Sequence, residues 1–150
     1  MIDFSPTTPF RLVRELAAAG QSAPSIYLLV CDDRSTGVVR SDLVAEIEIQ
    51  LGFKVQSLAA SRVRPDKLED GLKQSGTDWS IVLLIFDHWL PKLTESIDRN
   101  VVLLTRAGTV LLLANPKIAE RVLAAAPNLR NRITDVLSIK PDEALEGTRA

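Results

Sequence analysis

Three acidic residues and one lysine stand in this sequence directly after apolar runs. The acids are Asp32, Asp33 and Asp87, and the lysine is Lys140. If the runs are parallel strands, their carboxyl ends lie along one edge of a sheet, where open α/β folds bind ligands. Carboxylates gathered there repel one another unless a cation lies among them. These residue types therefore predict a Mg²⁺ site beside a lysine that pairs with an added anion.

The elements that would position these residues alternate along the chain. We expect five strands, at residues 26–30, 53–58, 80–86, 109–114 and 133–139. Helices are expected at residues 41–51, 65–74, 92–106, 117–125 and 142–147. Residues 101–105 are β-rich, so a strand there is an alternative. Alternating elements of this length predict an α/β fold with a doubly wound parallel sheet and right-handed crossovers.

The first residues of the chain differ from this alternating pattern. Apolar residues recur at helical spacing over residues 10–19, and a Gln-Ser-Ala-Pro linker follows. We therefore predict an N-terminal helix and linker at residues 1–24 and an α/β domain at residues 25–150.

Composition excludes several classes of function. The chain has 150 residues, 46% apolar and 25% charged, with 18 basic and 19 acidic residues, which suits one ordinary globular core. This balance predicts no nucleic-acid surface. Its apolar runs are too short to span a membrane, and its start lacks the features of a secretory signal. A single cysteine, Cys31, excludes an internal disulfide. We expect a cytoplasmic protein in which Cys31 is a small buried residue.

The expected strand order determines whether the acids meet. In a five-stranded sheet of order 2-1-3-4-5, the first and third strands are neighbours at the topological switch point. Asp32 and Asp33 would then face Asp87 across one crevice. With Mg²⁺ bound, Asp87 would be ionised and able to attack a phosphoryl group. The ion and Lys140 would neutralise the charge on the transferring group.

These motifs resemble those of a response-regulator receiver domain of two-component signalling. The resemblance extends from about residue 25 to residue 147. It rests on the acidic pair Asp32-Asp33, on Asp87 in the turn Asp-His-Trp-Leu-Pro, and on the Lys140-Pro141 pair after the last strand.

The resemblance implies a role for each of these residues. Asp87 would accept a phosphoryl group from a histidine kinase or phosphotransfer protein. Asp32, Asp33, Asp87 and the backbone carbonyl of Trp89 would hold Mg²⁺, and Lys140 would pair with the phosphoryl oxygens. The protein would then be a signalling domain rather than an enzyme. It would act on a downstream protein partner, either as a single chain or as a homodimer.

Two positions depart from the receiver pattern. Receivers carry a hydroxyl residue at the end of the fourth strand, where this chain has Ala114 unless residues 101–105 form that strand and supply Thr105. They also carry an aromatic residue three positions before the lysine, where this chain has Leu137. Both halves of the usual switch are altered, which favours an atypical or pseudo-receiver that signals by binding.

A second family offers an alternative. The late part of the chain resembles an AAA+ ATPase, in which a strand ends in a polar sensor residue, here Asn115, and an arginine finger follows, here Arg132. Asp87 would end the Walker B strand. The phosphate loop is missing, because residues 34–41 contain one glycine and no lysine. The alternative is thus a degenerate ATPase-like scaffold, and it predicts the strand order 5-1-4-3-2 instead of 2-1-3-4-5.

Overall fold

The computed structural model describes residues 5–19, 25–52, 55–64, 80–102 and 108–142. The helix expected at residues 65–74 lies outside these ranges. Residues 143–147 of the helix expected at 142–147 also lie outside them, and so do residues 103–105 of the alternative strand expected at 101–105. The first two residues of that alternative strand are helical.

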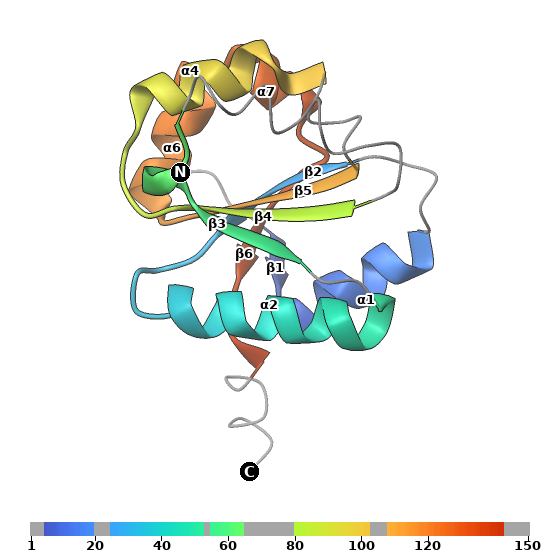
Figure 1. The fold of residues 1–150 in the computed structure, drawn as a ribbon. Coiled ribbons are helices and arrows are strands. Elements are labelled where there is room, and N and C mark those ends of the chain that lie inside the picture. The colour runs from blue at the N-terminus through green and yellow to red at the C-terminus, as the bar shows by residue number, and fades with distance from the viewer. Residues whose placement is uncertain (1–4, 20–24, 53–54, 65–79, 103–107, 143–150) are drawn as a thin grey trace.

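A parallel sheet forms the centre of the molecule (Figure 1). Within the described residues it has six strands, all paired in parallel. They are β1 (Ser5–Thr7), β2 (Ile26–Val30), β3 (Gln56–Ala59), β4 (Ser80–Phe86), β5 (Gly108–Ala114) and β6 (Asp135–Ile139). The predicted α/β class is confirmed, and β1 is a strand that the sequence pattern did not predict.

The order of the strands differs from the expected one. The sheet runs β1-β6-β2-β5-β4-β3. If the five expected strands are numbered along the chain, this order is 5-1-4-3-2, with β1 added outside the fifth. The prediction 2-1-3-4-5 is therefore wrong. Both orders place strands one, three and four in the centre and strands two and five outside them, so the same apolar runs suit either order.

Helices cover both faces of the sheet (Figure 1). One face carries α1 (Pro9–Ala19) and α2 (Thr36–Leu51), and the other carries α4 (Pro91–Arg99), α6 (Pro116–Ala125) and α7 (Pro127–Arg132). The predicted N-terminal helix is present as α1. Among the described residues, no helix combines the length and the apolar character that a membrane span requires.

Helix boundaries differ from the prediction where local signals were weak. α2 begins five residues before the predicted start, because Thr36 and Gly37 continue directly from the turn after β2. It ends as predicted at Gly52, whose φ of 74° is the left-handed conformation that glycine adopts without strain. α4 ends at Arg99, earlier than predicted, and α7 was not predicted.

The core lies in two layers, one on each side of the sheet. Alternate residues of each strand face opposite layers, so Leu112 packs beneath α4, α6 and α7 whereas Leu111 and Leu113 pack toward α1 and α2. All seven residues of β5 are buried. Complete burial of one leucine contributes about 1.5–3 kcal/mol, which favours a central position for this strand.

Candidate functional site

The carboxyl edge of the sheet brings several polar residues into a row. In the order of the strands, Lys140 follows β6, Asp32 and Asp33 follow β2, Asn115 follows β5, Asp87 follows β4, and Ser61 lies just after β3. The predicted acids and lysine are thus on one edge, as parallel pairing requires. Their neighbours differ from those of the receiver order and match those of the alternative order 5-1-4-3-2, because β5 lies between β2 and β4.

Asp32 belongs to the turn that leads from β2 into α2. Its Oδ1 accepts a hydrogen bond of 3.0 Å from the backbone N–H of Ser35, the residue before α2. Its carbonyl accepts a 3.1 Å bond from the hydroxyl of Thr36. This arrangement is typical of aspartate in a turn, where the side chain bonds the backbone a few residues on. Asp32 therefore organises the entrance to α2, with its carboxylate exposed to solvent.

Asp33 contacts the end of the neighbouring strand β5. Its Oδ1 accepts a 3.1 Å hydrogen bond from the Nδ2 of Asn115. The Oδ1 of Asn115 in turn accepts a 2.8 Å bond from the N–H of Ile118 and so caps the start of α6. One amide group therefore joins the acidic turn after β2 to the helix after β5.

Asp87 is bonded on the opposite side, toward β3. One carboxylate oxygen accepts a 3.0 Å hydrogen bond from the backbone N–H of Ser61, and the other accepts a bond from the Ser61 hydroxyl. Burial raises the pKa of Asp87, but the two bonds from Ser61 and the charge of His88 outweigh it and leave the pKa below its ordinary value of 3.8. Asp87 is therefore an exposed, ionised carboxylate held by a serine.

The expected crevice of three carboxylates does not form among the described residues. In the described part of the chain, no group of three or more His, Cys, Asp or Glu side chains is placed to hold a metal ion. The cause is the strand order: β5 and Asn115 separate Asp33 from Asp87. The set expected for Mg²⁺, with Asp32, Asp33 and Asp87 as ligands, depended on β2 and β4 being neighbours.

Lys140 follows β6, on the side of β2 away from Asp87. Its backbone N–H donates a 3.1 Å hydrogen bond to the carbonyl of Thr7, and its side chain is exposed. Nearby, Asp142 accepts a 3.0 Å bond from the N–H of Phe10 at the start of α1. Contacts with β1 and α1 therefore hold this segment, and within the described residues no salt bridge joins Lys140 to Asp87.

The loop after Asp87 packs onto the layer beneath α4 and α6. Trp89 is half-buried against the apolar core, and the guanidinium carbon of Arg121 lies 5.8 Å from the centre of a Trp89 ring. This cation–π contact joins the loop to α6. His88 is exposed beside Asp87.

The altered switch positions are buried. Ala114 ends β5 and pairs with Val30 of β2 and Phe86 of β4, so β5 is the fourth of the five expected strands. Its side chain is 3% exposed and provides no hydroxyl at this edge. Leu137 on β6 is also buried.

Ser61 is the one residue of this row that sequence reasoning missed. It lies in a short 3₁₀ turn at Ala60–Arg62 after a strand whose end was predicted at residue 58. A serine in a polar loop carries no distinctive sequence signal. Its contact with Asp87 follows only from the pairing of β3 with β4.

Comparison with known proteins supports the fold and gives no family. No protein-family model matches the chain, and no curated protein matches it. Among solved structures, the chain is similar to the crystal structure of a DNA polymerase III gamma subunit-related protein from Thermotoga maritima, with a TM-score of 0.59 and 12% identity. The match covers 89% of this chain and 48% of that one, so this chain spans about half of that protein.

Proposed function

We propose that this chain is a scaffold domain with an AAA+-like α/β fold that works by binding other proteins and does not hydrolyse a nucleotide. The observation that carries this proposal is the order β6-β2-β5-β4-β3, which is the 5-1-4-3-2 order expected for the ATPase alternative. In that order Asp87 follows the third strand, which is the position of the Walker B acid in the ATPase pattern. Asn115 follows the fourth strand, which is the position of the sensor residue.

The turn after β2 argues against phosphate binding. In nucleotide-binding α/β folds this turn presents backbone N–H groups of a glycine-rich loop, and a lysine, to the phosphates. Here Asp32 and Asp33 occupy the turn, and the carboxylate of Asp32 already accepts the N–H of Ser35. Two exposed carboxylates at this position repel a polyphosphate.

The similar solved structure supports a place in an assembly. That protein is named as related to a DNA polymerase III subunit, and a subunit is by definition part of a larger complex. We therefore infer that this chain contributes a binding surface to a multi-protein complex.

A nucleotide-binding experiment tests the proposal. Isothermal titration of the full chain with ATP and with ADP, each with Mg²⁺, should give no saturable binding up to about 1 mM, equivalent to a free energy weaker than about −4 kcal/mol. The matched variant Asp32→Asn with Asp33→Asn removes the repelling charges and measures their contribution. Saturable binding by the unmodified chain would contradict the proposal.

The same preparation tests the receiver interpretation. The chain is incubated with Mg²⁺ and acetyl phosphate, and its intact mass is measured beside that of Asp87→Ala. On the scaffold proposal neither protein gains a phosphoryl group. An adduct that is present in the unmodified chain and lost in Asp87→Ala would instead favour phosphoryl transfer to Asp87, with Lys140 and Mg²⁺ as its partners.

A further inference from the structure

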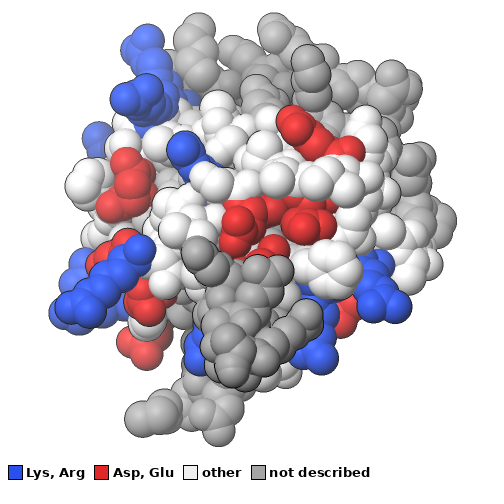
Figure 2. Space-filling model, turned by 90° about the horizontal axis from the view of Figure 1, so that it is seen from below, with Lys and Arg blue, Asp and Glu red and all other residues white. Residues whose placement is uncertain are grey.

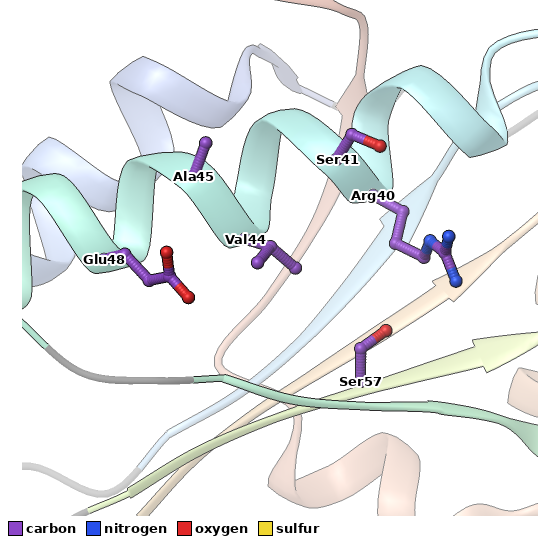
Figure 3. Close-up of a pocket in the computed structure, with 6 residues that line it drawn as sticks. All are labelled: Arg40, Ser41, Val44, Ala45, Glu48 and Ser57. Carbon is purple, nitrogen blue, oxygen red and sulfur yellow. The ribbon is translucent and has the colours of Figure 1, made fainter.

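An open groove lies between α2 and the edge strand β3, away from the row of acids. It has a volume of about 360 Å³ and is lined by Arg40, Ser41, Val44, Ala45, Glu48 and Ser57. Five of these residues lie on α2, and Ser57 lies on β3 (Figure 3). The strand order ends at β3, which pairs only with β4 among the described strands, so the groove runs beside an edge of the sheet.

The floor of the groove holds a hydroxyl group that has no hydrogen-bond partner among the described residues. The Oγ of Ser57 is buried and makes no hydrogen bond in the described part of the chain. Figure 3 shows this hydroxyl pointing toward α2, across from Val44. A buried polar group that lacks a partner is costly, so a ligand that supplies a hydrogen bond there gains affinity.

Opposite charges lie at the two ends of the groove (Figure 3). α2 leaves the carboxyl end of β2 and returns to the start of β3, so it runs antiparallel to the strands. Arg40 therefore lies toward the carboxyl end of β3, and Glu48 lies toward its amino end. Neither side chain forms a salt bridge within the described residues. The side of the molecule that carries α1 and α2 has both signs of charge, with acidic side chains near the middle of the view and most basic ones farther out (Figure 2).

This spacing matches an extended peptide. Arg40 and Glu48 are eight residues apart on a helix, or about 12 Å at 1.5 Å per residue. In a β-strand, residues i and i+4 are about 13 Å apart and point to the same face. A strand added to β3 in parallel would thus present a basic residue to Glu48 and, four positions later, an acidic residue to Arg40.

We propose that the α2–β3 groove binds an extended segment of a partner protein that adds to β3 as a parallel strand, with a basic residue at i, a threonine-like residue at i+2 and an acidic residue at i+4. The middle side chain places a methyl group on Val44 and Ala45 and a hydroxyl on Ser57. The choice of a protein as the partner rests on the proposed scaffold function. The scaffold proposal is tested by nucleotide binding and the groove proposal by peptide binding, so the failure of one can be told from the failure of the other.

Two labelled peptides and a charge-swapped protein test this inference. The probes are Gly-Lys-Val-Thr-Val-Glu-Gly and its charge-reversed form Gly-Glu-Val-Thr-Val-Lys-Gly, titrated with the full chain by fluorescence anisotropy. The first should bind about tenfold more tightly, because two exposed ion pairs replace two repulsive contacts. The double variant Arg40→Glu with Glu48→Arg keeps the net charge and should reverse the preference.

The controls separate recognition from loss of folding. Both substituted residues are exposed, so the swapped protein should melt at the temperature of the parent. Equal affinity for the two peptides, an unchanged preference in the swapped protein, or no binding of either peptide would overturn the inference.

Discussion

Asp33 and Asp87 follow two central strands, yet their side chains accept hydrogen bonds from residues that follow different strands. Asp33 bonds toward the middle of the sheet, to Asn115 after β5. Asp87 bonds toward the outer strand, to Ser61 after β3. Each carboxylate has its own local donor, so neither needs a shared cation to offset its charge. In this chain the two carboxylates therefore bond to different partners, and β5 lies between the strands that they follow.

Both turns begin from a buried residue. Cys31, two residues before Asp33, and Phe86, directly before Asp87, are each 3% exposed. Burial raises the pKa of the Cys31 thiol to about 11. The acidic turn after β2 is thus anchored on the core.

The largest expected effect is on the reactivity of Cys31. A pKa about two units above the ordinary value leaves about 100-fold less thiolate at pH 8, and burial slows access further. Alkylation by iodoacetamide, followed by intact mass, should therefore be at least about 100-fold slower in the native chain than in urea. Cys31→Ala supplies the unlabelled control. Rapid native labelling would show that the end of β2 opens in the folded protein, so that the start of the Asp33 turn is not held in the core.

A smaller effect is expected from the amide that joins β5 to the Asp33 turn. Asn115→Ala removes the cap of α6 and the donor to Asp33, and it should lower the free energy of unfolding by about 1–2 kcal/mol. Urea unfolding followed by circular dichroism measures this loss.

The matched variant Asn115→Asp separates the two contacts of this amide. It keeps an acceptor for the N–H of Ile118 but places a carboxylate beside Asp33. Its loss of stability therefore measures the lost hydrogen bond to Asp33 together with the repulsion between the two carboxylates. An Asn115→Ala protein as stable as the parent would mean that this bridge contributes nothing.

The smallest effect concerns Asp87 and depends on pH. Its pKa is lowered in the folded state, so its contribution to stability is complete above the ordinary value of 3.8 and is lost as the pH falls through the folded value. Asp87→Asn should cost less than about 1 kcal/mol at pH 7, because the group is exposed. The gap from the parent should narrow as the pH falls below 3.8, as measured by urea unfolding.

Ser61→Ala is the control for this titration. It removes one of the two donors to Asp87 and should reduce the pH dependence, while the backbone N–H of Ser61 remains. A gap between Asp87→Asn and the parent that stays constant from pH 7 to pH 2 would show that Ser61 does not favour the ionised carboxylate.

Local pattern predicted much of this fold. Continuous apolar runs located β2 and β4 at their observed bounds, and Gly52 marked the end of α2. Short elements escaped prediction, because three residues of β1 and six of α7 carry too little periodicity. For the candidate site, the sequence placed Asp33, Asp87 and Lys140 correctly at strand ends. It missed Ser61 and paired the acids with the wrong neighbours.

The amino-acid sequence by itself located the five longer strands, indicated which of them are central, and placed acids after two of them. An apolar run favours a central strand because its side chains are then buried on both faces of the sheet. The orders 2-1-3-4-5 and 5-1-4-3-2 bury the same three runs in the centre, so burial alone does not distinguish them. Only the tertiary structure decided that β5 enters between β2 and β4. The chain reaches either arrangement through right-handed crossovers, so the choice depends on the packing of the whole sheet and its helices. That choice separated Asp33 from Asp87 and left the groove between α2 and β3 at the edge of the sheet.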